Sequence, residues 1–502
     1  MQHMIAPAPY RLAVLGLLVS LACAPKEATD KSVRVDSPAA VAAPTAAKIP
    51  ITSSSDEART FYTQGRDLSE QLRNQDARKL FEQAAAKDST FAMAHYSLAL
   101  TAPTTKEFLQ HLSHAVALSE KASDGERLLI LALDAGSKAN PAKALQYAEE
   151  IVAKYPADER AHFSLGNAYV ARQQNDKAIT EFKKAIEINP SFSPAYNSLG
   201  YAYRPLGNDA EAEKAFKKYI ELLPNDPNPY DSYAELLMKT GRFDESIQQY
   251  RKALSVDKNF GSSHVGIAAD LMFQGKHDEA IAEAQKLYDA ARDDGDRRTA
   301  LFSQVVTHID AGKTAQALQQ MEQLYALGSK AADTATMSGD AVATADILLD
   351  AGRVDEARQH YDRSLALLTG SSASAEVKED ATLAAHYNKG RVALAKNDLA
   401  TATTEAAEFL KGAEAKQNDV RIRQAHALGG TIAQKERKFD DAIAEFGKAN
   451  QQDPYVLYMT ALAYKGKGDT AKAKELAQQA ANANALPTLN SAFVRVKAKT
   501  IG

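Results

Sequence analysis

The amino-acid sequence predicts an all-α fold in which helical hairpins stack side by side into a solenoid. Two adjacent segments, residues 159–192 and 193–226, place the same residue types at equivalent positions 34 residues apart. Within each segment, the apolar and small residues fall on the faces of two amphipathic helices. Apolar residues make up 45% of the chain and charged residues 25%, a balance typical of an ordered fold.

The two segments agree in residue type, order and spacing. Small residues, glycine and alanine, allow the two helices of a hairpin to approach closely, and the aromatic rings fill the space between hairpins. Proline ends the second helix because it cannot donate the next backbone hydrogen bond. The matching residues are Leu165 with Leu199, Gly166 with Gly200, Tyr169 with Tyr203, Ala178 with Ala212, Phe182 with Phe216, and Pro190 with Pro224.

This pattern resembles the tetratricopeptide repeat (TPR), a helix-turn-helix unit that carries L-G-x-x-Y, then A-x-x-x-F, then P. In the same phase, units begin near residues 125, 159, 193, 227 and 261. Weaker units fit near residues 58 and 92, and further units fit downstream near 298, 338, 383, 423 and 454. The resemblance covers residues 58–487 and implies a TPR superhelix of about a dozen helical hairpins. The hairpins must stack, because one hairpin cannot bury its apolar face alone.

The unit starts at 338 and 383 follow the preceding starts by 40 and 45 residues instead of 34. We expect the additional residues, in "GSKAADTATMSGD" and "GSSASAEVKED", to form loops. A change of superhelix direction around residues 328–340 would divide the array into two lobes. The predicted domains are an N-terminal TPR array at residues 56–330 and a C-terminal TPR array at residues 331–487.

Residues 488–502 are predicted to form a capping helix and tail. Leu489, Phe493 and Val496 are spaced so that they share one face of a helix, and Arg495, Lys497 and Lys499 lie among them. Terminal repeats need such a helix because their outer face must be polar.

The N-terminus resembles the signal peptide of bacterial lipoproteins. Arg11 precedes an apolar run at residues 12–21, which is too short to span a bilayer because a spanning helix needs about 20 residues. The run leads to Cys23, the only cysteine in the sequence. In the lipoprotein family, that cysteine is lipidated and becomes the mature N-terminus. Residues 1–22 are therefore predicted to be a lipoprotein-type signal peptide; ordinary signal-peptidase cleavage would instead leave a soluble exported protein.

The segment after the cysteine, residues 23–55, is rich in Ala, Pro and Ser and is predicted to be a disordered tether. Ala24 stands where the lipoprotein family's inner-membrane retention signal has Asp, which favours an outer-membrane lipoprotein facing the periplasm. The expected location is the bacterial cell envelope.

Residues 305–314 read "VVTHIDAGKT", which is close to the phosphate loop of elongation-factor GTPases. In the repeat frame, however, Gly312 falls at the turn between two helices, as do Gly241, Gly275 and Gly352. A phosphate loop joins a strand to a helix, and no buried-strand pattern precedes this one. We therefore expect a repeat turn and no nucleotide binding.

Other chemistry is not indicated. The formal net charge is −4, from 60 Lys+Arg and 64 Asp+Glu, which argues against a nucleic-acid surface. His111 and His114 are three residues apart, and His95 could lie near them, but two surface histidines without a clear third ligand do not predict a metal site. His162 and His264 occupy core positions of their units. No H-E-x-x-H or G-x-S-x-G motif occurs, so we expect no cofactor and no enzymatic activity.

The resemblance also implies a concave groove lined by the first helix of each unit. Its mixed aromatic, amide and charged residues suit an extended peptide or a helix of a protein partner. The pattern of the chaperone-binding carboxylate clamp is not present, because only Asn167 matches it. The groove residues carried over are Arg160, Phe163, Asn167, Asn197, Tyr201, Arg204, Asp231, Glu235, Met272 and Phe273.

The sequence therefore predicts a non-catalytic scaffold or adaptor that binds protein or peptide partners in the cell envelope, as an assembly factor. One alternative is a soluble exported carbohydrate-handling helper that stacks sugars on Phe163, Tyr201 and Phe273. The other is an enzyme whose active site is built into the array.

Overall fold

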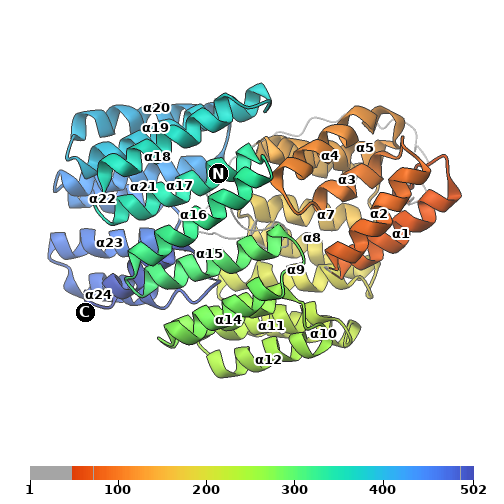
Figure 1. Ribbon diagram of the computed structural model, residues 1–502, viewed down its shortest axis with the longest axis horizontal. Helices are drawn as coiled ribbons and strands as arrows, with labels where there is room; N and C mark the ends of the chain where they lie inside the picture. Colours follow the sequence, from red (N-terminus) through yellow and green to blue (C-terminus); the bar gives the residue numbers. More distant parts are fainter. Residues whose placement is uncertain (1–47, 72, 139, 487, 502) are drawn as a thin grey trace, which may run out of the picture.

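The computed structural model describes residues 48–501 except residues 72, 139 and 487. This part of the chain consists of α-helices, two short 3₁₀ helices and connecting turns, without a β-strand. Its helices pair into twelve hairpins followed by one further helix, so the predicted all-α TPR solenoid is confirmed (Figure 1). The predicted signal peptide, Cys23 and the tether as far as residue 47 lie outside the described residues.

The first seven hairpins follow the 34-residue spacing, and none of their helices is longer than 15 residues. The 3₁₀ helices η2 (Ser119–Lys121) and η3 (Arg204–Leu206) extend α4 and α9. The hairpins pair α1 (Asp56–Glu70) with α2 (Asn74–Lys87), α3 (Ala92–Leu100) with α4 (Thr105–Leu118), α5 (Asp124–Ser137) with α6 (Pro141–Lys154), α7 (Glu159–Ala171) with α8 (Asn175–Ile188), α9 (Ser193–Tyr203) with α10 (Asp209–Leu222), α11 (Pro227–Lys239) with α12 (Phe243–Val256), and α13 (Gly261–Phe273) with α14 (His277–Asp289).

The first four of the next five hairpins each contain a helix longer than 15 residues, and α25 (Leu489–Ala498) follows the last hairpin. None of the helices in the described part of the chain has the length and apolar character that crossing a membrane requires. The hairpins pair α15 (Asp294–Asp310) with α16 (Thr314–Lys330), α17 (Thr334–Asp350) with α18 (Val354–Thr369), α19 (Ala375–Ala395) with α20 (Leu399–Ala415), α21 (Asp419–Lys435) with α22 (Phe439–Lys448), and α23 (Pro454–Lys467) with α24 (Thr470–Ala481).

The loop prediction for the two widely spaced units is wrong, because most of the additional residues lengthen helices. Between α16 and α17 only residues 331–333 are not helical, and Ala332 makes the turn with φ +50°. The second segment keeps a short connection at residues 370–374, after which α19 extends over 21 residues. Alanine, lysine and glutamate in these segments favour helix. The serines and glycines of the first segment lie within α16 and α17, and those of the second mark the turn at residues 370–374. The stack continues from α16 to α17 across the predicted domain boundary at residue 330.

The predicted tether ends earlier than residue 55, because the chain is already bound to the array from Lys48 onward. The backbone N–H of Ile49 donates to Asp158 at 2.7 Å, that of Thr52 to Glu126 at 2.9 Å, and that of Ser54 to Asp88 at 2.8 Å. Carboxylates near helix ends thus satisfy the N–H groups of a segment that has no secondary structure of its own.

The superhelix turns far enough to bring distant hairpins into contact (Figure 1). Helix α4 packs against α17, and the backbone N–H of Lys106 donates to Asp333 at 3.3 Å. Further along, the guanidinium of Arg172 pairs with Asp419 at 2.8 Å, linking the end of α7 to the start of α21. These contacts bridge more than 200 residues of sequence, so the first and last thirds of the array support one another.

Within four of the twelve hairpins, a glycine of the first helix lies directly against an aromatic ring of the second. A Cβ atom added to Gly166 would come within 2.4 Å of the Phe182 ring, and one added to Gly200 within 2.6 Å of the Phe216 ring. The pairs Gly65 with Phe81 and Gly430 with Phe446 repeat this contact at 2.8 and 2.6 Å. All four rings are fully buried. The small residue therefore sets how closely the two helices pack.

We predict that Gly166→Ala destabilises the array by about 1–3 kcal/mol, because the new methyl group would overlap the buried Phe182 ring. The matched control is Gly136→Ala in α5, where an added Cβ meets no atom within 4 Å. That substitution should stabilise the helix by up to about 1 kcal/mol. Urea denaturation midpoints measure both effects. Equal midpoints for the two variants would show that close packing at Gly166 is not limiting.

Candidate functional site

Gly312 forms the turn inside a hairpin, as the sequence predicts. It lies between α15 and α16 with φ +72°. Its N–H donates to the Ile309 carbonyl at 3.0 Å, and the N–H of Lys313 donates to the His308 carbonyl at 2.7 Å. N–H groups bonded in this way are not free to cradle a phosphate. The same left-handed turn residue is found at Gly241, Gly275 and Gly352.

Four hairpins carry the same histidine–glutamate pair. In each, Nδ1 of a histidine on the first helix lies 2.6–2.8 Å from a carboxylate oxygen on the second helix, 19 residues later. A pair that recurs at equivalent places in four hairpins joins helices; a catalytic dyad would be expected once. The buried position of His162 and the partly buried position of His264 agree with their expected core placement. The pairs are His162 with Glu181, His264 with Glu283, His386 with Glu405, and His426 with Glu445.

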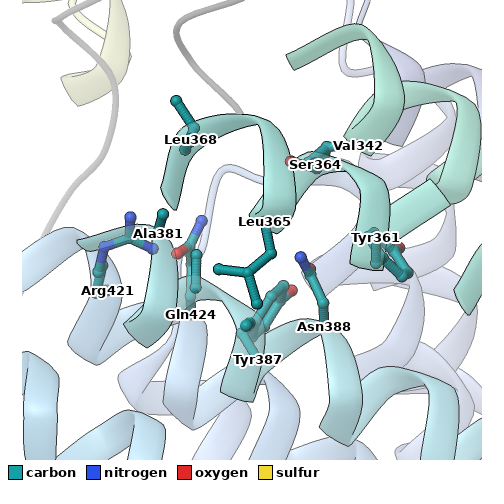
Figure 2. A pocket seen from close by; sticks show the side chains of 12 residues that line it. Val342, Tyr361, Ser364, Leu365, Leu368, Ala381, Tyr387, Asn388, Arg421 and Gln424 are labelled. Carbon is teal, nitrogen blue, oxygen red and sulfur yellow. The ribbon is translucent and has the colours of Figure 1, made fainter. Parts of the chain in front are cut away.

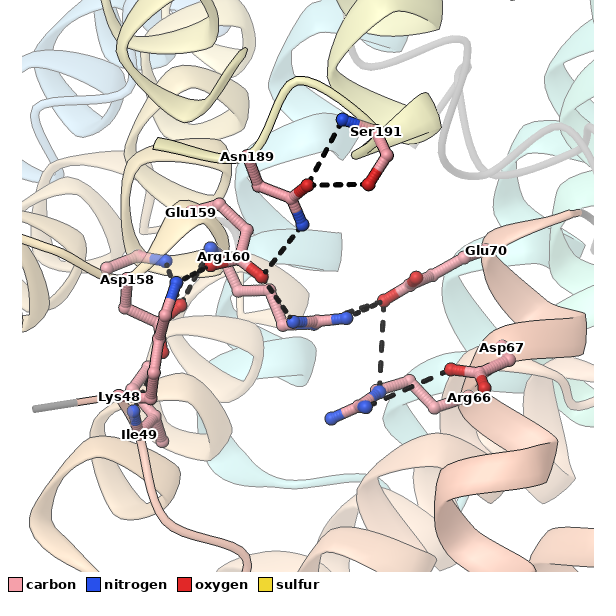
Figure 3. A network of polar contacts seen from close by, with 11 residues as sticks. Lys48, Ile49, Arg66, Asp67, Glu70, Asp158, Glu159, Arg160, Asn189 and Ser191 are labelled. Carbon is pink, nitrogen blue, oxygen red and sulfur yellow. Dashed lines mark hydrogen bonds and ion pairs between the residues drawn. The ribbon is translucent and has the colours of Figure 1, made fainter. Parts of the chain in front are cut away.

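The predicted groove residues of α7 are half-buried and bonded within the array. The guanidinium of Arg160 lies between Glu70 of α1, at 2.9 Å, and Glu159, at 2.8 Å (Figure 3). The ring of Phe163 packs edge to face on that of Phe192, with centroids 5.4 Å apart. These two side chains therefore hold α1, α7 and the start of α9 together.

The predicted groove residues of the next two hairpins form a buried polar cluster. Arg204 donates to Glu235 at 3.0 Å, and both side chains are buried. The hydroxyl of Ser263 donates to Asp231 at 2.7 Å. Burial, followed by the nearby charge of Glu235, raises the pKa of Asp231 well above its usual value. The ring of Tyr201 lies under the Arg204 guanidinium. The side chains of this cluster therefore contact one another and do not face an open groove.

The last two predicted groove residues, Met272 and Phe273, are covered by α25. This helix packs on α15, α17 and α23, which are the first helices of their hairpins and line the inner surface of the array. Leu489 and Phe493 of α25 join the same buried cluster as Met272 and Phe273. The predicted apolar face is wrong at Val496, which is 51% exposed. Helix α25 thus occupies the inner surface where the sequence places a partner.

An ion pair fixes α25 in this position. Nε of Arg495 donates to Asp310 at 2.6 Å, and a terminal nitrogen of the guanidinium pairs with the other carboxylate oxygen. The guanidinium also donates to the carbonyl of Met272 at 3.2 Å. Both side chains of the pair are almost completely buried. A charged group this deep must be paired, so Arg495 sets the register of α25 against α13 and α15.

The aromatic residues proposed for sugar stacking are packed on other side chains. Phe273 stacks on Phe243, with ring centroids 5.7 Å apart. Tyr201 meets Phe216 edge to face at 5.3 Å, and Phe163 is held by Phe192 as described above. Flat, accessible rings are needed to stack a sugar, and these three do not provide them. Asn167 and Asn197, the remaining groove residues, are half-buried, and Oδ1 of Asn197 has no hydrogen-bond partner in the described part of the chain.

Two pockets lie at places that sequence reasoning missed. One, of about 40 Å³, is enclosed by α17, α18, α19 and α21, with Tyr387, Asn388 and Gln424 pointing into it (Figure 2). The other, of about 440 Å³, opens beside α25 between the ends of α11, α13 and α24. Its lining includes Lys239 and Arg495, which are paired with Asp209 and Asp310, and the exposed Lys499, which favours an anionic group. The basic residues of α25 were visible in the sequence, but their position inside the array was not.

The structure also supplies the third histidine that the sequence could not place. His95 of α3 lies against His111 and His114 of α4, and one ring nitrogen from each lies within 4.8 Å of the others. Burial, with the charges of the other two imidazoles, lowers the pKa of His95 to about 4. Burial also lowers the pKa of His111, and the nearby Arg78 adds to this effect. Neutral imidazoles are the form that binds metal ions.

Comparisons with known proteins agree with the repeat assignment. Sequence models described as TPR repeat or tetratricopeptide repeat match residues 62–107, 166–207, 193–226, 228–260, 302–372 and 455–484. The chain therefore contains tetratricopeptide repeats in both predicted arrays. A comparison with curated proteins gives no match.

Several solved structures are similar to parts of the chain. A tetratricopeptide repeat protein from Parabacteroides merdae is 16% identical and covers 52% of this chain and 98% of its own, with a TM-score of 0.35. TTC0263, a thermophilic TPR protein of Thermus thermophilus, is 24% identical over 43% of this chain and 98% of its own, with a TM-score of 0.28. YrrB, described as a TPR protein with an unusual peptide-binding site, is 16% identical over 36% and 91%, with a TM-score of 0.25.

We predict that Arg495→Ala costs roughly 3 kcal/mol, because it leaves the buried Asp310 carboxylate without its arginine. The control on the same helix is Lys497→Ala, which removes an exposed pair with Asp350 and should cost less than about 1 kcal/mol. Hydrogen exchange should show the Arg495 loss concentrated in α13, α15 and α25. Equal effects of the two substitutions would contradict the anchoring role of the Arg495 pair.

Proposed function

We propose that this tetratricopeptide-repeat chain is a non-catalytic scaffold that binds protein or peptide partners in the bacterial cell envelope, as an assembly factor. The observation that carries the proposal is the position of α25, an amphipathic helix held on the inner surface by α15, α17 and α23. A surface that holds one helix through an apolar face and a buried ion pair has the features needed to bind a helix of a partner protein. Repeat arrays use such inner surfaces for recognition.

The partner site we propose is the pocket beside α25, not the full length of the predicted groove. Arg204, Asp231 and Glu235 bind one another, and Met272 and Phe273 are covered. The pocket, in contrast, has room for side chains of a partner. Its exposed Lys499 would attract an acidic segment, and the partly buried ring of Phe243, which stacks on Phe273, offers an apolar wall. Lys239 and Arg495 are already paired with Asp209 and Asp310.

A non-catalytic role fits the chemistry of the array. The histidine–carboxylate pairs that resemble catalytic dyads recur in four hairpins and join helices. The glycine turn that resembles a phosphate loop uses its N–H groups within the hairpin. TPR architecture is itself typically non-catalytic, so binding is the function that these features support best.

We also propose that lipidated Cys23 anchors the chain to the outer membrane, facing the periplasm. The support is the signal-peptide pattern before the cysteine and Ala24 after it. An anchored chain would meet the array at Lys48, which pairs with Glu159 near the start of α7.

The binding site can be tested by photo-cross-linking in cells. We predict that p-benzoylphenylalanine in place of Asn482, an exposed residue of the pocket, forms a discrete adduct with a partner protein. The same probe in place of exposed Arg251 on α12, outside the pocket, should not. Lys499→Glu should reduce the adduct about fivefold or more, because a favourable charge becomes repulsive.

The matched control for charge is Lys474→Glu, which makes the same change at an exposed position of α24 outside the pocket. It should leave the adduct unchanged. Adducts of equal yield from the Asn482 and Arg251 probes, or equal loss with both lysine variants, would place recognition elsewhere on the molecule.

The anchor has a separate test. We predict that the N-terminal peptide of the mature protein begins at Cys23 and carries the mass of a lipid-modified cysteine. Acyl chains contribute about 0.8 kcal/mol per buried CH₂, an attraction that salt does not screen, so the protein should stay with membranes in high-salt washes. Cys23→Ser removes the sulfur that forms the thioether. An unmodified mature N-terminus in the wild-type protein would rule out the anchor.

A further inference from the structure

Three histidines converge within the second hairpin. His95 lies on α3, and His111 and His114 lie one turn apart on α4. The Nδ1 atoms of His95 and His111 are 3.4 Å apart. The His114 ring stands edge-on to both others, with centroids 5.3 Å from His95 and 6.5 Å from His111. No other group of three or more histidine, cysteine or carboxylate ligands close enough for one ion occurs in the described part of the chain.

The nitrogen spacing fits a metal centre. A tetrahedral Zn²⁺ ion with Zn–N bonds of about 2.0–2.1 Å holds two nitrogen ligands about 3.3–3.4 Å apart. The two Nδ1 atoms already have this separation. One ring nitrogen of His114 lies within 4.8 Å of a ring nitrogen of each of the other two histidines, so a rotation of the exposed His114 side chain would bring it to the ion. Three imidazoles leave one position of a tetrahedral ion open.

The hairpin holds the two helices in this arrangement. On α4, Phe108, Leu112 and Ala115 are buried, which fixes the face on which His111 and His114 lie. Arg78 of α2, whose charge acts on His111, is paired with Glu82 at 3.0 Å and Glu107 at 2.6 Å. Two carboxylates therefore accompany one guanidinium, and the local charge does not repel a divalent cation.

We propose that the α3–α4 hairpin binds one divalent transition-metal ion of the Zn²⁺ class through Nδ1 of His95, Nδ1 of His111 and the imidazole of His114. Imidazole ligands suit zinc, copper and nickel and do not suit magnesium or calcium. The fourth position takes water or a ligand from outside the chain, on the exposed side where His114 lies. The site is separate from the pocket beside α25 and does not depend on the scaffold function.

The test uses the mature full chain, purified without a polyhistidine tag and titrated with Co²⁺, whose visible absorption reports tetrahedral nitrogen coordination. We expect one equivalent to bind, and Zn²⁺ to displace it. His95→Asn should weaken Co²⁺ binding at least tenfold, because it reduces three protein ligands to two. The matched control is His360→Asn, which changes a half-buried histidine of α18 outside the cluster and should leave binding unchanged.

Circular dichroism of each variant separates metal loss from unfolding, and His111→Gln provides a second ligand variant if His95→Asn does not fold. Absence of saturable Co²⁺ and Zn²⁺ binding would overturn the proposal and leave the Nδ1 contact as a hydrogen bond between imidazoles. Binding of equal strength in the wild-type, His95→Asn and His111→Gln chains would also overturn it, because the ion would then sit elsewhere.

Discussion

The close approach of the two helices in each hairpin is the contact on which the rest of the array depends. In four of the twelve hairpins a glycine of the first helix lies against a buried aromatic ring of the second, from Gly65 and Phe81 to Gly430 and Phe446. With the interhelical distance fixed, each hairpin presents the same apolar surfaces to its neighbours. Small rotations between hairpins then add up, and the array turns until α4 meets α17 and α7 meets α21.

The local repeat could be predicted because its signals are local. The first helices begin at or close to the expected unit starts, and Gly312 is the expected turn. The exception is α19, which begins at Ala375 instead of near residue 383, since "GSSASAEVKED" combines a short serine-rich turn with strong helix formers. The position of α25 could not be predicted, because Arg495 and Asp310 are 185 residues apart and their pairing depends on the curvature of the whole array.

Curvature also explains why the groove differs from its prediction. A repeat pattern identifies the side chains that face inward, and the ten predicted residues include five that are buried. The pattern does not say which groups these side chains contact. Arg204 and Glu235 contact each other, and Phe273 packs in one cluster with residues of α25. The same limit applies to the histidine cluster, where the 3.4 Å contact of His95 with His111 requires the known packing of α3 on α4.

The central claim is that the inner surface of the array is a helix-binding surface, filled in part by α25. Native-state hydrogen exchange of the intact chain tests it most directly. The account predicts that residues 489–498 exchange as slowly as α13 and α15, because Leu489, Phe493 and the Arg495–Asp310 pair bury them together. Complete exchange of residues 489–498 within seconds, while α13 and α15 stay protected, would contradict the claim and leave an open groove in its place.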